Sequence, residues 1–421
     1  MRTPSRIIVS LFSGTTAAAI VALLVLGAVG GRAAEVPCGT DTGATYLATS
    51  LAVAQRIAAE ERAGPTVSRA KHTIESDTTL AKAIARDDVA AVHQQIGVLL
   101  YNHEHIVRIR LLSASGGVIA DVGGKLVLSP ISGDFRIGGR VVGSFMFSVQ
   151  DDMGYRLLTQ RLVGANTVMR YQGRTVMDNL DVGAQALADG ATISAGGRSY
   201  LVTSIVLGHF PTGQLVVWLL VGEPPASLAT QSCLQIRAGV LGDVARRVYL
   251  ENKTGPAIQI ARSAVTGSVV LPAALAHGHV AAVRASARRL LRAAHILRIQ
   301  IISKGGSIVD VRSTSEPLVQ PVSIPIRGRS HRVIGRALVA VQSVDGFVGI
   351  SSYLTGAPIV TSTGTTQLTD GDLSGLPSLP VSGPVTAAGA SYHVASFTGM
   401  LYPSGALAVH LLSPDAAPAS S

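Results

Sequence analysis

The sequence predicts an α+β protein made of two tandem domains, each an antiparallel sheet of about five to six strands with N-terminal helices packed on it. The first observation behind this is an internal repeat of about 190 residues, in which Ile106–Val122 reads again as Ile296–Val311. The others are apolar residues at helical spacing early in each copy and strand-like alternation after them. Because a unit of this length can bury its own core, the repeat indicates a pair of domains rather than a solenoid.

Helices are expected at the start of each copy. Apolar side chains share one helix face from Val89 to Leu99, and the same stripe recurs from Val280 to Leu290. Because these stripes come before the strand patterns, the helices precede the sheet and lie across one of its faces.

Strand patterns follow the helices. Apolar and polar residues alternate from Ile106 to Leu111, and a turn rich in Ser and Gly then leads into Val118–Val122, which indicates a hairpin followed by a Gly-rich loop. The further elements expected in the first copy are the strand Val141–Gln150, the short helix Tyr155–Leu162, a hairpin around Gln172 and Gly173, and the closing strands Tyr200–Leu207 and Gln214–Val221.

The domain limits follow from the repeat. We expect residues 1–37 to be an N-terminal membrane anchor or signal peptide, 38–230 the first domain, 231–413 the second domain and 414–421 a disordered tail.

The N-terminal segment has a positive flank and a long apolar run. Arg2 and Arg6 precede apolar residues from Ile7 to about Gly31, a length that can span a bilayer. Signal-peptide apolar regions are usually shorter, so we expect a single uncleaved span with the body extracytoplasmic. Secretion after signal cleavage is the alternative.

The composition is that of packed domains with a basic surface. The chain is 47% hydrophobic and 14% charged, which argues against disorder, and its formal net charge is +10. That charge favours anionic partners such as a lipid surface or a cell-wall polymer. Nucleic acid is not expected, because no basic stripe is interleaved with aromatic residues.

The two cysteines follow the repeat. Cys38 and Cys233 each stand just before the first helix of their copy. Outside a membrane, thiols tend to oxidise, so we expect a disulfide between them, with two unpaired thiols as the alternative.

Three stretches carry a family resemblance: Ser113–Asp121, Arg140–Val149 and Val333–Val341. Together with the layout of anchor, leading helices and a sheet interrupted by one short helix, they resemble the extracytoplasmic Cache domain, a PAS-like sensor fold. The resemblance covers nearly all of residues 38–413 and implies two tandem sensor domains outside a bacterial membrane. Domains of this family bind small polar metabolites and pass a signal inward.

This sequence departs from the family at two points. It has no amino-acid-recognition signature from which a ligand could be carried over, and no output module follows the second copy. Signalling is therefore expected to run through a separate protein or through the anchor.

The resemblance places a pocket between the sheet and the segment crossing it, here residues 139–171. An Arg side chain offers a planar fork for a carboxylate, and Tyr adds a directional hydroxyl. The expected residues for a small organic anion or amino-acid-like ligand are Arg140, Tyr155, Arg161, Arg170 and Tyr171. A solvated helix face with ordinary strand-exterior arginines is the alternative. The second copy replaces two of these side chains, so the first copy is the better candidate to bind.

Two other polar groups have simpler interpretations. His103, Glu104 and His105 are of metal-ligand type, but their spacing favours a polar helix end, and we expect no metal or cofactor. A basic run on the second-copy helix and the next strand could face anionic lipid or wall polymer, or be a solvated face; its members are Arg284, Arg288, Arg289, Arg292 and Arg298.

No enzymatic signature is found, and we expect neither catalytic residues nor an enzyme. Asp121 and Asp310 recur in both copies, but at a hairpin strand where they are expected to pair or cap. The function expected is extracytoplasmic sensing or binding of a small molecule. The alternative is a non-sensing envelope protein that binds anionic polymer or lipid.

Overall fold

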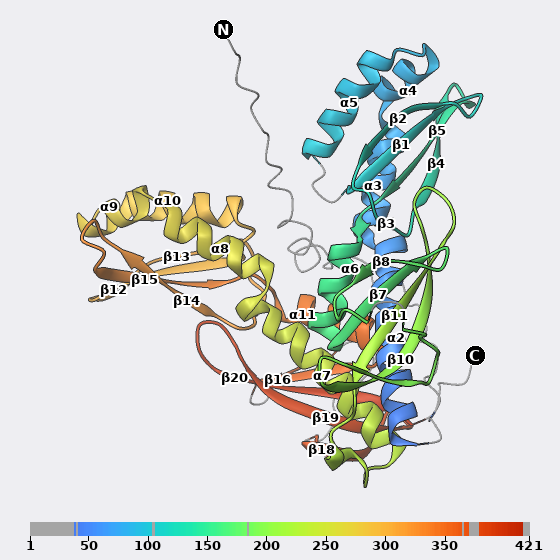
Figure 1. Cartoon of the computed structure of the whole chain (residues 1–421). Helices are drawn as coiled ribbons and strands as arrows, with labels where there is room; N and C mark the ends of the chain where they lie inside the picture. The colour runs from blue at the N-terminus through green and yellow to red at the C-terminus, as the bar shows by residue number, and fades with distance from the viewer. Residues whose placement is uncertain are drawn as a thin grey trace.

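The computed structural model describes residues 38, 41–102, 106–182, 185–363, 366–369 and 379–415. The expected anchor or signal peptide therefore lies outside the described residues. Helices and strands alternate in blocks, and the same order of blocks occurs twice along the chain (Figure 1).

The first repeat has two modules. Its outer module contains α3 (Pro65–Ser76), α4 (Thr78–Ala85), α5 (Val89–Asn102), β1 (Arg108–Ser113), β2 (Val118–Gly123), β4 (Ile131–Ile137) and β5 (Arg140–Ser148). Its basal module contains α2 (Thr42–Ala63), α6 (Asp152–Leu158), the π-helix η1 (Thr159–Val163), β7 (Ala165–Tyr171), β8 (Arg174–Asp178), β9 (Thr192–Ala195), β10 (Arg198–Gly208) and β11 (Gln214–Gly222). A short pair, β3 (Val127–Leu128) and β6 (Gln150–Asp151), lies between them, and the 3-10 helix η2 (Ala226–Leu228) leads to the second repeat.

The second repeat has the same division. Its outer module contains α8 (Pro256–Gly267), α9 (Val270–Ala276), α10 (Val280–Ala293), β12 (Arg298–Ser303), β13 (Gly306–Arg312), β14 (Val322–Arg327) and β15 (Val333–Ala340). Its basal module contains α7 (Cys233–Thr254), α11 (Val344–Thr355), β16 (Ile359–Thr363), β17 (Thr366–Thr369), β18 (Ser382–Ala387), β19 (Ala390–Met400) and β20 (Ala406–Pro414).

The strand orders confirm the duplication. The outer sheets run β2-β1-β5-β4 and β13-β12-β15-β14, and the basal sheets run β8-β7-β11-β10-β9 and β17-β16-β20-β19-β18. All their strand pairs are antiparallel, so the predicted α+β class with helix-backed antiparallel sheets is confirmed.

One detail of the prediction is corrected, because each repeat holds two sheets, of four and five strands, instead of one of five to six. After β5 the chain turns through α6 and η1 and starts a new sheet at Ala165, so the strands of the four-stranded sheet do not pair with those of the five-stranded sheet. An isolated antiparallel bridge between Leu128 of β3 and His209 links the two modules. Alternation in a sequence identifies strands but does not choose their partners, which here lie far apart along the chain. The predicted Gly-rich loop also contains β4, an edge strand of seven residues.

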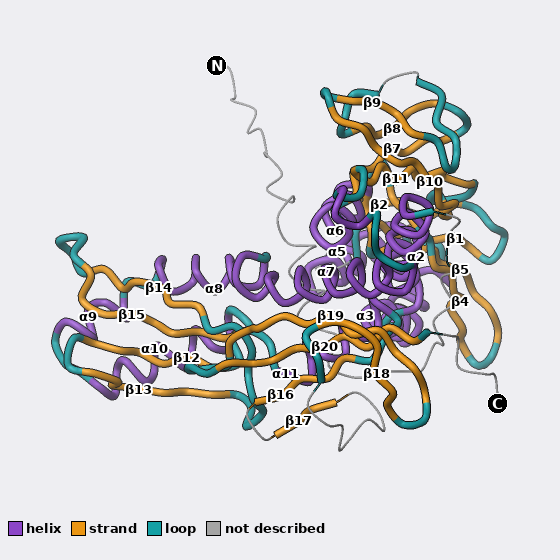
Figure 2. The backbone as a smooth tube through the Cα atoms, turned by 90° about the horizontal axis from the view of Figure 1, so that it is seen from below, coloured by secondary structure: helices purple, strands orange, loops and turns teal. Residues whose placement is uncertain are grey.

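The two basal modules share one hydrophobic core, while each outer module has a core of its own. The shared core joins buried residues of α2 and α7 with those of α6, α11 and the inner faces of both basal sheets. The outer cores are built under α3–α5 and under α8–α10. Figure 2 shows α2 and α7 between the two basal sheets, and Figure 1 shows the outer modules diverging from this base.

A break after each long helix sets the direction of each outer module. Gly64 ends α2, and Pro65 begins α3 at the first helical position, where a missing N–H costs nothing. Gly255 and Pro256 repeat the device between α7 and α8. A Cβ at Gly64 would lie 2.6 Å from the backbone carbonyl oxygen of Glu60, so the close approach of the helix backbone requires glycine.

The expected disulfide is present. Cys38 and Cys233 are bonded, with Cα atoms 5.6 Å apart across a sequence separation of 195 residues. The bridge ties the start of α7 to the residue that precedes α2 by a few positions, so it clamps the base of both repeats.

Two further expectations concern the chain ends and the membrane. Two residues of the expected tail are ordered, because Pro414 closes β20 and the Asp415 carboxylate contacts Nδ1 of His393 at 2.7 Å; the rest of the expected tail lies outside the described residues. Within the described residues, no single helix has the length and apolar character to cross a bilayer, and only the bent combination of Cys233–Gly267 with Val270–Ala276 meets those two criteria.

We predict that replacing Cys38 and Cys233 by Ser lowers the free energy of unfolding by about 2–5 kcal/mol, since the bridge closes a very long loop in the unfolded chain. Urea denaturation of the double variant, compared with the unreduced protein, measures this difference. Adding reductant should lower the stability of the native protein but leave that of the variant unchanged; equal loss in both would contradict the prediction.

Candidate ligand-binding site

The five residues expected to bind a ligand are placed in different parts of the first repeat. Arg140 is exposed at the tip of the β4–β5 hairpin in the outer module. Tyr155 is buried in the shared core, where its hydroxyl donates a hydrogen bond to the carbonyl oxygen of Ala54 at 3.2 Å. Complete burial raises the pKa of Tyr155 well above its ordinary value.

The other three residues make internal contacts in the basal module. Arg161 forms an ion pair with Glu251 of α7, and its Nε donates to Oε1 of that residue at 3.0 Å. Arg170 donates through Nη2 to the carbonyl oxygen of Gln185 at 2.7 Å. The ring of Tyr171 stacks on that of His209, with 3.9 Å between centroids. The five side chains thus lie in separate places and make separate contacts, and their role as a ligand set stays a prediction.

A groove on the first outer module is the better candidate. It has a volume of about 670 Å³, within the range of small-molecule sites. Helix α3 and β4 contribute mostly polar side chains, and β1 and β5 contribute mostly apolar ones; the residues are Lys71, Glu75, Leu112, Ser132, Gly133, Asp134, Arg136, Ser144, Phe145 and Met146.

The strand alternation of β4 gives the groove its polar wall. Ser132, Asp134 and Arg136 are exposed, whereas Phe135 is fully buried in the core below. In the register of the sheet, Ser132 lies opposite Met146 of β5. The alternation of buried and exposed side chains that marks a strand was present in the sequence. The expectation of a Gly-rich loop at this segment missed it.

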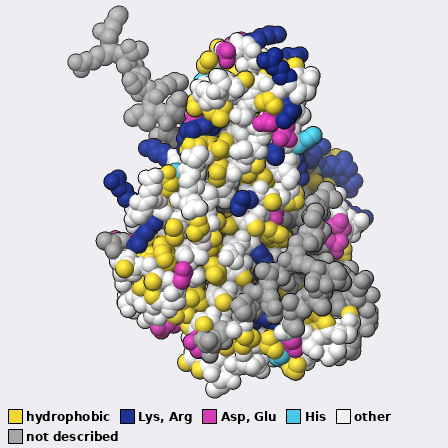
Figure 3. Space-filling view, turned by 90° about the vertical axis from the view of Figure 1, so that its right-hand side faces the viewer, with side chains coloured by type: hydrophobic (Ala, Val, Ile, Leu, Met, Phe, Trp, Pro, Cys, Tyr) yellow, Lys and Arg dark blue, Asp and Glu magenta, His cyan; other side chains and the backbone are white. Residues whose placement is uncertain are grey.

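Charges of both signs stand in the groove. The Arg136 guanidinium lies 3.0 Å from the Asp134 carboxylate, and Lys71 Nζ lies 3.8 Å from the Glu75 carboxylate. These four side chains are about half exposed, and exposed ion pairs contribute little stability. A ligand with an anionic and a cationic group can therefore replace these pairings at low cost. Figure 3 shows Lys and Arg, with Asp and Glu among them, over the upper end of the molecule, where this module lies.

The corresponding positions of the second repeat lack the acidic groups. Thr266 stands at the position of Glu75, and Pro325 at that of Asp134. The basic positions are kept as Arg262 and Arg327. At these four positions only the first repeat therefore carries both signs of charge. The expectation that the first copy is the better candidate to bind stays a prediction.

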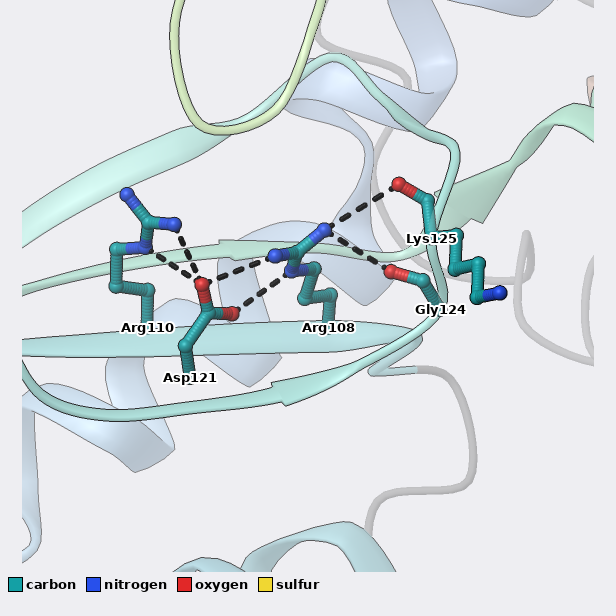
Figure 4. A network of polar contacts seen from close by, with 5 residues as sticks. All are labelled: Arg108, Arg110, Asp121, Gly124 and Lys125. Atoms are coloured by element: carbon teal, nitrogen blue, oxygen red, sulfur yellow. Dashed lines mark hydrogen bonds and ion pairs between the residues drawn. The ribbon is translucent and has the colours of Figure 1, made fainter.

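Beside the groove, on the same face of the sheet, two arginines converge on Asp121 (Figure 4). Arg108 donates from Nε and Nη2 to the two carboxylate oxygens at 2.8 and 2.9 Å, and Arg110 donates from Nε at 2.8 Å. Hydrogen bonds from Arg108, aided by Arg110, hold the pKa of Asp121 below its usual range. The Arg108 guanidinium also lies 4.7 Å from the ring centroid of Phe210, in the β10–β11 turn of the basal module.

The second repeat has the same joint, that is, an arginine bound to an aspartate of the outer sheet and lying over an aromatic ring of the basal module. Arg298 donates to the carboxylate of Asp310 at 3.0 and 2.6 Å and lies 4.7 Å from the ring centroid of Tyr402. The expectation that Asp121 and Asp310 form structural pairs is confirmed. In both repeats this cluster connects the outer sheet to the basal module.

Contacts between the repeats follow an approximate two-fold symmetry. Arg161 of the first repeat pairs with Glu251 of the second. The equivalent positions, with the repeats exchanged, are Tyr353 and Glu60, and these two side chains also form a hydrogen bond. Burial, together with the neighbouring carboxylate of Glu60, raises the pKa of Tyr353 to about 12. Such reciprocal contacts are those of an isologous dimer interface, formed here within one chain.

A second reciprocal pair lies at the ends of the short helices. Arg56 of α2 donates through Nη1 to the carbonyl oxygen of Thr355 at 2.9 Å, at the end of α11. Its equivalent, Arg247 of α7, packs against Gly164 at the end of η1, where a Cβ would lie 2.4 Å from its Nη1. A φ of +81° favours glycine at this position.

A buried carboxyl group lies where the modules of the first repeat meet. Glu61 of α2 is 8% exposed, and the Gln150 amide, with its nitrogen turned toward the carboxyl, donates to both oxygens at 3.0 and 2.9 Å. Burial, with the charges of Glu60 and Asp151 adding to it, raises the pKa of Glu61 to about 8. The matching pair in the second repeat is Asn252 and Gln342, so a neutral amide occupies the equivalent position.

His103, Glu104 and His105, considered above as metal-ligand types, lie outside the described residues.

Comparison with known proteins gives distant likenesses among solved structures. No protein-family model and no curated protein matches the chain. The ligand-binding domain of the amino-acid chemoreceptor PctC of Pseudomonas aeruginosa, in complex with GABA, aligns with 14% identity and a TM-score of 0.25 over 42% of this chain and 99% of that one. An extracellular ligand-binding receptor from Desulfohalobium retbaense aligns with 8% identity and a TM-score of 0.27 over 53% of this chain and 47% of that one.

We predict that Glu61→Gln removes a pH dependence of stability. A carboxyl whose pKa rises from 4.5 to about 8 on folding stabilises the fold fully below pH 4.5, and this contribution is lost as pH rises to about 8. The variant should be the more stable protein at pH 8, by on the order of a few kcal/mol. Urea midpoints at pH 5 and pH 8 measure the effect, and an unchanged pH dependence would contradict it.

We also predict that Arg161→Ala lowers the free energy of unfolding by about 1–3 kcal/mol, because Glu251 keeps a partly buried charge without its partner. Tyr353→Phe, at the two-fold related position, is the matched control and should cost less, since it removes only a hydroxyl group. The double variant Arg161→Ala, Glu251→Gln should recover part of the loss in urea denaturation.

Proposed function

We propose that this protein is an extracytoplasmic, membrane-tethered binding or sensing protein with two Cache-like domains, and that the groove of the first outer module takes its ligand. The observation that carries the proposal is this groove, which combines a volume suited to a small molecule with paired charges of both signs. The ligand would be a small polar molecule with an acidic and an amino group. We propose binding alone, without chemical conversion of the ligand.

The mechanism is a population shift. Lys71 and Glu75 of α3 and Asp134 and Arg136 of β4 line the groove. A ligand that bridges them favours one spacing of α3 and the sheet. Since α3 continues from α2 through the Gly64 break, such a change would reach the base of the molecule, next to Cys38. A separate signalling protein, or the N-terminal segment, would carry the signal further.

A titration of the purified protein with amino acids, carboxylates and amines tests the proposal. We expect at least one compound to raise the melting temperature and to bind in calorimetry. Asp134→Asn should weaken that binding by about tenfold or more, since a charge-assisted hydrogen bond is lost.

The matched control is Arg327→Gln in the second repeat, at the position of Arg136, which should leave ligand affinity unchanged. If no compound of the three classes binds, or if both variants lose affinity equally, the groove is not the ligand site.

A further inference from the structure

The positive charge of the chain is concentrated in the second outer module. Residues 256–340 contain 12 Lys and Arg and two Asp and Glu, whereas the matching residues 65–148 contain nine and seven. The excess of Lys and Arg over Asp and Glu in residues 256–340 therefore equals the net charge of +10 of the whole chain. The two modules share one strand order, so the fold does not require this difference.

Helix α10 carries the densest part of this charge. Its apolar side packs on the sheet through Val283, Ala287 and Leu290, and four arginines lie on its exposed side: Arg284, Arg288, Arg289 and Arg292. Three of them, Arg284, Arg288 and Arg292, are four residues apart, which places their side chains in a row with about 6 Å between successive Cα positions along the helix axis.

The first repeat shows that the fold does not need charged residues on this helix face. His93, Gly97, Val98 and Tyr101 of α5 occupy the positions of Arg284, Arg288, Arg289 and Arg292, and they too are exposed. Within the described part of the chain, none of the four arginines forms an ion pair with Asp or Glu. Like charges four residues apart destabilise a helix, so the row costs stability that α5 does not lose.

We infer that the exposed face of α10 is a docking surface for an extended phosphodiester polymer. Guanidinium groups bind phosphate with two parallel hydrogen bonds, and a polymer with one charge per repeat can meet successive arginines of the row. A membrane surface fits less well. Apart from Val280 at its first residue, the exposed face of α10 carries only Arg and Ala, while Val283 and Leu290 are buried and Leu291 is partly buried against the core. The helix also lies away from the disulfide-clamped base, on the upper side of its module in Figure 1, with β12–β15 below it.

Binding of the full protein to poly(glycerol phosphate) tests this inference, measured by fluorescence anisotropy between about 50 and 200 mM salt. The variant Arg284→Gln, Arg288→Gln, Arg292→Gln should bind at least about tenfold more weakly at the lower salt concentration and show a shallower salt dependence. The matched control removes the same charge elsewhere, at the exposed Arg69, Arg86 and Arg174, and should keep the native affinity.

A transplant gives the positive test. In the weakened variant, His93→Arg, Gly97→Arg and Tyr101→Arg rebuild the row on α5, where an added Cβ at Gly97 meets no neighbouring atom, and binding should return. Equal loss in the control variant, or failure of the native protein to bind the polymer, would overturn the inference. So would equal affinity for poly(galacturonic acid), or binding to phosphatidylglycerol vesicles in place of the polymer. These outcomes do not depend on the groove of the first repeat.

Discussion

The packing of α2 against α7 is the interaction on which the rest of the structure depends. Both helices start at the Cys38–Cys233 bridge, and their buried faces form one core with both basal sheets. The reciprocal contacts of Arg161 with Glu251 and of Glu60 with Tyr353 fix the two repeats to each other. A dimer-like interface is thus built into a single chain, and its formation does not depend on protein concentration.

This shared base leaves the outer modules independent. Each has its own core and is connected to the base by a helix break and by an arginine–aspartate–aromatic joint, Arg108 with Asp121 and Phe210 in the first repeat. The duplicated backbone could therefore diverge in surface chemistry alone. One module has a groove with both signs of charge, and the other has an arginine row, on the same arrangement of helices and strands.

Part of the candidate site could be predicted and part could not. The pairing of Asp121 and the bond between the cysteines followed from positions that recur in both copies. The groove did not, because Lys71 and Asp134 are 63 positions apart in the sequence and meet only when α3 packs beside the edge strand β4. Tyr155 and Arg161 have the side chains of a ligand site, but burial in the shared core uses their polar groups for internal contacts.

The sequence by itself determined the duplication, the α+β class, the leading helices and the disulfide, because each depends on local periodicity or on a repeated residue. The tertiary structure decided which strands pair, that each repeat holds two sheets, and that the two basal modules share a core. These features depend on contacts between residues far apart in the chain. Burial decided the protonation of Glu61 in the same way, since its raised pKa comes from surroundings that Gln150 and its neighbours provide only in the folded protein.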